Sequence, residues 1–530
     1  MTPKDYLSSL PRDLAAGTVV FLVALPLCLG IAKASGAEPF AGLVSGIVGG
    51  LIVAALSGSR LSVSGPAAGL VVIVIDGIAR LGSFSAFLVA VLLSGAIQFV
   101  FGMLKAGRLA AYVPSPVIKG MLAAIGLLLI IKQLPLALGL TSGPGSDAAS
   151  AVAHAGSIAT PFGAVSPMAC AVAVLSLALL AGWETRALRR FKLVRLVPAP
   201  LAVVVIGIAA TLAGEALGAS FALPVEHRVA LPELASLAAL GNALSFIDFG
   251  PGLARLADPA VWIVAITLAV VASLESLLSL EAVEQIDPQR RPAPPDRELK
   301  AQGVGNLVAG AIGGLPITSV IVRSSANVHA GAQSRLSAIF HGVLLLVSLF
   351  ALTDVINLIP LACLAAILIF TGIKLAKPSL FVAMAKQGAA PFVPFVATVG
   401  GVLATDLLMG ILLGVACSVA LALWANLHRP IALAQHDDHF LLSFRKDVSF
   451  LGKVPLKQML SRIPDRATVI VDTTRADFID HDVRELLDRF IEDAPERAIA
   501  VEMRHATPVL PTATRGWSWN RGLAQQTGGR

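Results

Sequence analysis

The sequence predicts a polytopic α-helical membrane protein of fourteen segments, arranged as two inverted repeats of seven and followed by a small α/β domain. Three observations support this prediction. Hydrophobic residues make up 56% of the 530-residue chain and charged residues only 14%, whereas soluble globular domains carry about 25% charged residues. Apolar stretches of membrane-spanning length recur between residues 14 and 427. After about residue 435, charged residues become frequent and the long apolar stretches stop.

A helix needs about 20 apolar residues to cross the hydrocarbon core of a bilayer. This length predicts twelve full spans, at 14–34, 40–58, 84–104, 113–134, 161–183, 196–218, 259–283, 297–315, 337–353, 356–374, 390–407 and 408–427. Two further apolar stretches, 66–80 and 318–332, are too short to cross, and each follows an irregular run, GSRLSVSGP or GGLPITSV. We interpret these two as broken segments that begin within the membrane.

The second half of the membrane region, about 259–427, resembles the first half, about 14–218, in sequence and in the order of its segments. The stretches LAAIGLLLIIK at 122–132 and LAAILIFTGIK at 364–374 share six of eleven residues. A broken segment also comes third in each set of seven. Since seven is an odd number, the two halves lie in opposite orientations across the bilayer, which is the inverted-repeat plan of secondary transporters.

The net charge of +7 indicates topology rather than nucleic-acid binding. With a cytoplasmic N-terminus, the predicted inside connections collect most of the basic residues of the membrane region. They include two clusters, Arg186, Arg189, Arg190, Lys192 and Arg195, and Arg290, Arg291, Arg297 and Lys300. We expect no removable signal peptide, because the N-terminal residues lack a short apolar core followed by a small-residue cleavage site. The four cysteines lie far apart in apolar stretches, which excludes a disulfide framework and a zinc module.

The segment 435–505 reads as a small soluble α/β domain, and the even number of spans places it in the cytoplasm. Strand-like runs at 439–444, 467–472 and 498–503 alternate with the helix-like runs KVPLKQMLSRIP and HDVRELLDRFIEDA. The final stretch, 506–530, has no periodicity and is expected to be a mobile tail. The domains predicted are therefore a transmembrane domain over 1–434, the small domain and the tail.

Arg323 is the most informative single residue. A cation within an apolar segment is costly unless it serves a site or has a partner. It follows Thr318, Ser319 and Val322 at the start of the second broken segment, where a helix N-terminus offers free N–H groups and a partial positive charge. We predict an anion site there. The alternative is a structural pair between Arg323 and a carboxylate.

The first broken segment supplies a counterpart in Ser64, Gly65 and Pro66, with the proline expected at the first helical position. If the two repeats face each other at mid-membrane, both positive helix ends converge on one point. The alternative is that Gly and Pro only kink a helix.

Glu275 lies deep in the eighth segment and is a candidate proton carrier or sodium ligand. Ser276 follows it, and Ser279 shares its helix face four residues later. The alternative is an ion pair with Arg323 that only holds the core together, or a pair that an anion breaks during transport. The sequence contains no paired-carboxylate, Ser-His-Asp or P-loop constellation, so we do not expect an enzyme.

Four motifs in order resemble the SulP (solute carrier 26) anion transporters, and the resemblance extends to about residue 505. They are ALPLCLGIAKASG at 24–36, SGSRLSVSGPAAG at 57–69, SLESLLSLEAVE at 273–284 and GGLPITSVIVRSSANVHAGAQSRLSAI at 313–339. The resemblance implies a uracil-permease-like fold with core and gate domains and elevator-type alternating access. It also implies a homodimer and a cytoplasmic STAS domain in the C-terminal part.

Carried onto this sequence, the resemblance places Ala24, Leu25 and Leu27 of the first segment at the anion site, together with Thr318, Ser319 and Arg323 of the tenth. It places Glu275 at the position of an acidic cation-coupling residue. Leu27 stands where relatives often have Gln, which makes the edge of this pocket more apolar. FIDHDV at 478–483 stands where phosphorylatable relatives have Asp-Ser-Ser-Gly, so a phosphorylation switch is not expected.

These observations predict secondary active transport of a small inorganic anion, sulfate or bicarbonate, coupled to H⁺ or Na⁺ across a bacterial inner membrane. No cofactor, bound metal other than a coupling Na⁺ at Glu275, or nucleic-acid partner is expected. An uncoupled anion exchanger or a dicarboxylate symporter is the alternative within transport. The alternative from a different functional class is a regulatory protein whose transporter part is vestigial. A nucleobase permease would share the fold, but Arg323 favours an anion over a neutral base.

Overall fold

The computed structural model of the chain describes residues 3–107, 113–140, 166–185, 190, 197–217, 223–232, 237–244, 255–427, 431–448, 452–476 and 478–504. Residue contacts divide the chain into two compact units, Met1–Ser418 and Val419–Arg530. The predicted tail at 506–530 and most of the basic cluster at 186–195 lie outside the described residues.

The first half of the membrane region is helical apart from one short strand, β1 (Ser64–Pro66). Its helices are α1 (Pro3–Ala34), α2 (Pro39–Val48), η1 (Gly49–Val53), α3 (Ala54–Leu56), η2 (Ala68–Leu70), α4 (Val71–Leu81), α5 (Phe84–Met103), α6 (Ser115–Ala137), α8 (Pro167–Trp183) and α10 (Ala199–Leu217). Three short helices lie in the connection to the second half: η5 (Val225–His227), α11 (Leu237–Ala243) and η6 (Arg255–Ala257).

The second half repeats this pattern around strand β2 (Ile317–Ser319). Its helices are α13 (Pro259–Ile286), α14 (Pro295–Ile312), α15 (Ile321–His329), α16 (Leu336–Ala351), α17 (Thr353–Ile356), α18 (Leu361–Leu375), α19 (Pro378–Lys386), α20 (Ala389–Ala404) and α21 (Leu407–Leu427).

Local signals in the sequence fix several helix ends. Pro39, Pro167 and Pro259 stand in the first turn of their helices, where a missing N–H costs nothing. The hydroxyl of Ser83 accepts a hydrogen bond from the Ala86 N–H and caps α5. Gly313 ends α14 with a φ of 90°, which is in the left-handed region that favours glycine.

The chain is a multi-pass membrane protein. Among the described residues, seven helices are long and apolar enough to cross a membrane, and four apolar helices of 10–17 residues accompany them. Each predicted span corresponds to one or more helices, although the first residues of the span 161–183 lie outside the described part. The span predicted at 356–374 begins later, at Leu361, because Pro360 precedes its first helical turn.

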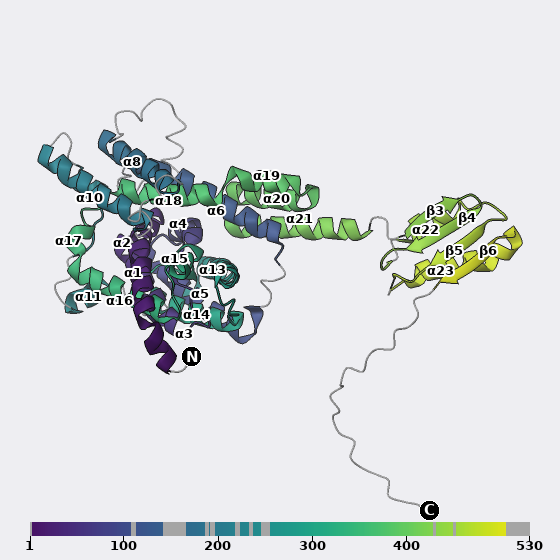
Figure 1. Cartoon of the computed structure of the whole chain (residues 1–530), viewed down its shortest axis with the longest axis horizontal. Coiled ribbons are helices and arrows are strands. Elements are labelled where there is room, and N and C mark those ends of the chain that lie inside the picture. Colours follow the sequence, from purple (N-terminus) through teal and green to yellow (C-terminus); the bar gives the residue numbers. More distant parts are fainter. Residues whose placement is uncertain are drawn as a thin grey trace, which may run out of the picture. The chain divides into compact units, whose positions relative to one another are not determined.

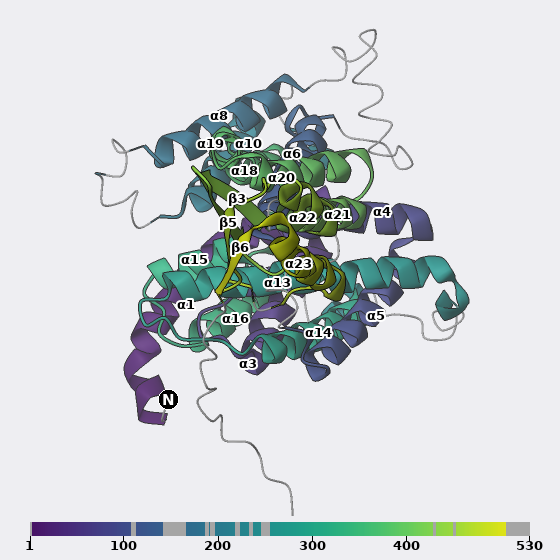
Figure 2. The same cartoon turned by 90° about the vertical axis from the view of Figure 1, so that its right-hand side faces the viewer.

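Helix packing shows the two-fold relation of the halves. Helix α1 packs against α16 of the other half, and its counterpart α13 packs against α5, the counterpart of α16. In the same way α8 packs against α18 and α20 against α6, while α6 and α18 pack against each other. Figure 1 and Figure 2 show α1, α2, α5 and α13–α16 in one group and α6, α8, α10 and α18–α21 in a second.

The two broken segments differ from the expectation in how they begin. Pro66 was expected to start a helix, but it lies in β1, and the first helical residues after it are Ala68–Leu70 of η2. The physical reason is that β1 pairs with β2, which requires extended backbone, and proline's fixed φ is compatible with a short edge strand. Thr318 and Ser319 likewise lie in β2 just before α15.

The C-terminal unit contains a four-stranded sheet with the order β3-β4-β5-β6. Its strands are β3 (Ile431–His436), β4 (His439–Phe444), β5 (Thr468–Asp472) and β6 (Ala500–Arg504); its helices are α22 (Lys453–Leu460), α23 (His481–Asp493) and η8 (Ala494–Arg497). The first pair of strands is antiparallel and the other two pairs are parallel. Strand β3, which was not predicted, begins before residue 435.

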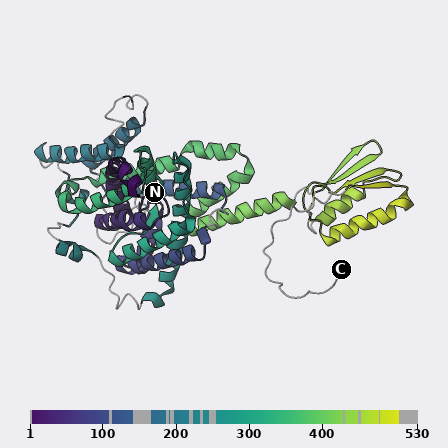
Figure 3. The same ribbon diagram turned by 60° about the horizontal axis from the view of Figure 1, so that its bottom comes forward.

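The small sheet buries one face against its helices. Phe440, Leu442 and Phe444 alternate along β4 and share a buried cluster with Leu456 of α22 and Leu487 of α23. Figure 3 shows α22 and α23 on the same face of the sheet. The strand buries every second residue and the helices bury one face, which is the pattern expected of an α/β unit. The predicted α/β character of this part of the chain is confirmed.

Candidate functional site

The centre of the membrane unit is the antiparallel pair formed by β1 and β2. Ser64 is opposite Ser319, and Gly65 is opposite Thr318. The Val320 N–H continues the pairing by donating to the Val63 carbonyl at 3.0 Å. Because each strand leads directly into a half-helix, η2 with α4 on one side and α15 on the other, the pair brings two helix N-termini close together.

Arg323 lies behind this strand pair and is fully buried. A side chain at Gly65 would collide with its Nη1, so the arginine fills the space that the glycine leaves open. Its Nη2 is 3.4 Å from the Pro66 carbonyl, while Nε and Nη1 have no hydrogen-bond partner among the described residues. The hydroxyls of Thr318 and Ser319 are also buried and unpartnered there.

Glu275 of α13 reaches the start of the first half-helix. Its carboxylate accepts a hydrogen bond from the Gly69 N–H, and a Cβ at Gly69 would come within 2.8 Å of both carboxylate oxygens. Ser276, the next residue, accepts a hydrogen bond from the Ser319 N–H at 3.2 Å and so ties α13 to β2. Within the described residues Glu275 and Arg323 form no ion pair, so each charge is available separately.

A cavity of ≈ 190 Å³ adjoins these groups. It lies between the two half-helices and α13 on one side and α6 and α18 on the other. Its lining consists of Ala68, Gly69, Met121, Leu122, Ile125, Glu275, Leu278, Ser279, Ala282, Val320, Ile321, Val322, Thr371 and Leu375. The cavity therefore separates the two groups of helices at the level of the strand pair.

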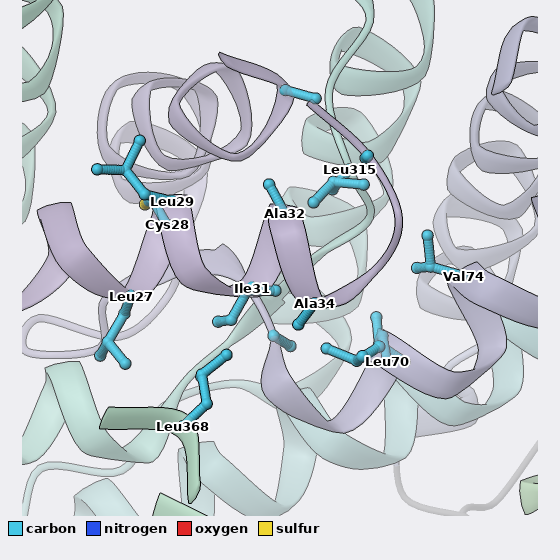
Figure 4. Close-up of a cluster of buried hydrophobic side chains, with 14 of the residues drawn as sticks. Leu27, Cys28, Leu29, Ile31, Ala32, Ala34, Leu70, Val74, Leu315 and Leu368 are labelled. Atoms are coloured by element: carbon cyan, nitrogen blue, oxygen red, sulfur yellow. The ribbon is translucent and has the colours of Figure 1, made fainter. Parts of the chain in front are cut away.

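The predicted site residues fall into three sets. Glu275, Ser279 and Val322 line the cavity. A second set lies in or against the strand pair without lining the cavity: Ser64, Gly65, Pro66, Ser276, Thr318, Ser319 and Arg323. The third set is on α1: Ala24 and Leu27 are buried and Leu25 is partly buried. Figure 4 shows Leu27 within the hydrophobic cluster, on the opposite side of α1 from Leu29.

Three polar residues that were not predicted hold the strand pair in place. Glu298, Gln302 and Asn306 occur at intervals of four along α14, and all three are fully buried. The Gln302 amide donates to Ser64 of β1 at 2.7 Å and to Glu298 at 2.9 Å. The Ser57 hydroxyl donates to the other Glu298 oxygen. The spacing was visible in the sequence, because residues four apart share a helix face.

Asn306 fixes β2. Its amide donates to the Ile317 carbonyl at 3.0 Å, and its carbonyl oxygen accepts from the Ile317 N–H at 2.6 Å. The same amide donates to Gln98 of α5 at 2.6 Å. The polar face of α14 thus positions both strands, one through Gln302 and the other through Asn306.

Replacing Asn306 by Leu is expected to lower the free energy of unfolding by about 2–4 kcal/mol, because it leaves the buried N–H and C=O of Ile317 without hydrogen-bond partners. It should also weaken anion binding, because β2 sets the start of α15. The matched control is Asn357→Leu, which removes a similar pair of hydrogen bonds to Leu231. Thermal unfolding and anion titration measure both effects. Equal loss of anion affinity in both variants would contradict a positioning role for Asn306.

Paired broken segments within two inverted halves are an arrangement typical of membrane transporters. Residues 10–398 match the sulfate permease family, and the chain belongs to this family. Its members are transporters rather than enzymes, in agreement with the expectation from the sequence. The chain is 26% identical over 450 residues to the putative sulfate transporter YvdB of Bacillus subtilis, covering 84% of this chain and 79% of that protein.

A second relative is the bicarbonate transporter BicA of a Picosynechococcus strain, 26% identical over 386 residues, with 71% of this chain and 63% of that protein covered. The solved transmembrane domain of a cyanobacterial BicA superposes with a TM-score of 0.60 at 24% identity, covering 78% of this chain and 97% of that one. The murine solute carrier 26 member A9 anion transporter, in an inward-facing state, gives a TM-score of 0.69 at 16% identity, covering 93% and 85%.

Proposed function

We propose that the protein is a secondary active transporter of a small inorganic anion, sulfate or bicarbonate, coupled to H⁺ or Na⁺ in a bacterial inner membrane. One observation carries the proposal: a single cavity between the two helix groups is bounded by a buried carboxylate and by the N-terminus of a half-helix backed by an unpaired arginine. Relatives named as sulfate and bicarbonate transporters support these two substrates.

The anion is held at the start of α15. The first N–H groups of a helix have no partner within the helix and carry its partial positive charge, and no side chain caps them here. Val322 places this turn at the cavity wall. Arg323 adds a full positive charge behind the strand pair, and no described carboxylate neutralises it. Neither the helix N-terminus nor Arg323 needs a metal ion to attract the anion.

The cation is held at Glu275. Moving an anion into a negative-inside cell costs about 2.3 kcal/mol per charge per 100 mV, which a co-transported cation offsets. A proton would neutralise the carboxylate directly. Sodium would take oxygen ligands, and Ser279 shares the cavity while Thr318 and Ser319 offer unpartnered hydroxyls nearby. Either cation removes the negative charge that Glu275 places at the cavity.

Transport follows an elevator-type movement in this proposal. The strand pair, α13 and α15 belong to one helix group, and α6 and α18, which form the opposite cavity wall, belong to the other. A sliding of one group against the other carries the cavity across the membrane. We assign 1–430 to transport and 431–505 to a cytoplasmic STAS-like domain. The boundary lies before 435, because β3 (Ile431–His436) belongs to the small sheet. Both termini lie in the cytoplasm, and the assembly is a homodimer in this proposal.

An uncoupled exchanger or a dicarboxylate symporter is the alternative. Purified protein in proteoliposomes, given radiolabelled sulfate or bicarbonate under imposed proton or sodium gradients, separates these cases. The proposal predicts accumulation above equilibrium when one inward cation gradient is present. Uptake that depends only on an anion inside the vesicles would identify an exchanger, and uptake of succinate alone would identify a dicarboxylate carrier.

A chain ending at residue 430 is expected to retain gradient-driven uptake, because the described residues that line the cavity all lie between Ala68 and Leu375. The measurement compares initial uptake rates of full-length and truncated protein at equal amounts in the vesicles. Loss of uptake by a truncated protein with an unchanged melting temperature would contradict this. It would favour the alternative in which the C-terminal domain carries the principal function.

A further inference from the structure

The cavity walls are far more apolar than a small inorganic anion requires. Helix α6 contributes Met121, Leu122 and Ile125, and α18 contributes Leu375 and the single hydroxyl of Thr371. Leu278 and Ala282 of α13 extend the same surface. A strongly hydrated divalent anion that enters such a cavity loses water contacts that these side chains do not replace.

The polar groups, in contrast, gather at one end. The Gly69 N–H is already bonded to Glu275, the Ser319 N–H to Ser276 and the Val320 N–H to Val63. The remaining backbone donors at the cavity are those of Ala68 at the start of η2, beside Glu275, and of Ile321 and Val322 in the first turn of α15. The cavity thus offers one anion-binding end and one apolar end.

We propose that this cavity binds short-chain organic monocarboxylates, with the carboxylate at the N-terminus of α15 and the alkyl chain against α6 and α18. The inference rests on the proposed anion transport and extends its substrate range. A dicarboxylate fits less well, because its second carboxylate would face either the apolar wall or the carboxylate of Glu275. Only one end of the cavity supplies donors for a negative charge.

The size of the cavity agrees with such a ligand. A volume of ≈ 190 Å³ far exceeds the ~10–15 Å³ of such space that one water needs, so the cavity has room for a carboxylate with a short alkyl chain. Bicarbonate or formate would leave much of the apolar wall in contact with trapped water. A chain of three or four carbons covers that wall, which is the usual way in which a mostly apolar pocket with few polar groups binds its ligand.

Equilibrium dialysis of the purified full-length protein with radiolabelled butyrate, and competition by formate, acetate, propionate and succinate, tests the proposal. Each buried methylene should tighten binding by about 4-fold, so butyrate should bind at least about tenfold more tightly than acetate. Succinate should bind no more tightly than acetate. Equal affinities along the series, or tighter binding of succinate, would overturn the proposal.

Ile125→Thr keeps the branched shape of the side chain while placing a hydroxyl on the cavity wall, and it should reduce the preference for butyrate over acetate several-fold. Leu122→Thr is a second variant on the same wall in case the first does not fold. The matched control, Ile131→Thr, changes a residue on α6 that is 45% exposed and does not line the cavity. A preference unchanged in every folded wall variant would overturn the assignment.

Uptake of labelled sulfate and bicarbonate by the same preparation in proteoliposomes keeps the two proposals apart. Inorganic anion uptake without butyrate binding would overturn this inference and leave the proposed function intact. Butyrate binding without uptake of either inorganic anion would support the inference and remove the proposed substrates.

Discussion

Glu275→Gln is expected to abolish concentrative anion uptake while leaving anion binding measurable. The substitution keeps the size of the side chain but removes the negative charge that a cotransported cation would neutralise. Since the anion is held at α15 rather than by Glu275, its binding should persist. In proteoliposomes with an inward proton or sodium gradient, anion uptake by the variant should rise only to equilibrium. The accumulation above equilibrium that the native protein shows should be lost completely.

The matched control is Glu281→Gln. Glu281 lies on the same helix, α13, but is exposed and does not line the cavity, so its variant should accumulate the anion normally. Undiminished, gradient-driven uptake by Glu275→Gln would contradict the coupling role of this carboxylate. A loss of anion binding together with uptake would instead place Glu275 in the anion site itself.

Arg323→Ala is expected to weaken anion binding by about 30-fold. A unit charge about 8 Å from the anion at an effective dielectric constant of about 20 contributes ~2 kcal/mol, which corresponds to this change in affinity. The effect should be on affinity more than on maximal rate, because Arg323 lies behind the strand pair and not on the cavity wall. Calorimetric titration with the transported anion measures it.

The control is Arg335→Ala, which removes an arginine that donates to the Ala55 carbonyl at 3.0 Å away from the cavity. Its anion affinity should equal that of the native protein. Melting temperatures of both variants separate loss of folding from loss of binding. An unchanged affinity in a folded Arg323→Ala protein would refute any electrostatic contribution of this residue.

Much of the membrane fold was predictable, because an apolar stretch of about 20 residues is a strong signal for a membrane-spanning helix. The two broken segments were recognised for the same reason, since their apolar stretches are too short to span. The predicted start of each broken segment was less accurate, because Pro66 and Thr318 lie in paired strands rather than at helix ends. A pairing between residues 251 to 255 positions apart cannot be inferred from either local sequence, where serine, glycine and proline also suit a helix start.

The two charged residues of the site could be predicted from the sequence, but the polar residues that hold the strand pair in place could not. Arg323 and Glu275 stand out because ionisable groups are rare inside membrane segments. Glu298, Gln302 and Asn306 were missed, because Glu298 was near a predicted helix end and neutral amides resemble ordinary helix residues. Strand β3 was missed because it directly follows the last apolar helix. Its residues pass from buried at Ile431 to exposed at His436 without alternation, so only the pairing with β4 identifies it as a strand.

The most direct test of an anion at the start of α15 is protection of a cysteine placed there. In a chain whose four native cysteines are replaced by alanine, Val322→Cys is treated with a charged thiol reagent in the presence or absence of the transported anion. Phe478→Cys, an exposed position in the small domain, serves as the control. We expect the anion to slow modification at Val322→Cys severalfold and to leave the control unchanged. An unaltered rate at Val322→Cys in a protein that still transports the anion would contradict this expectation.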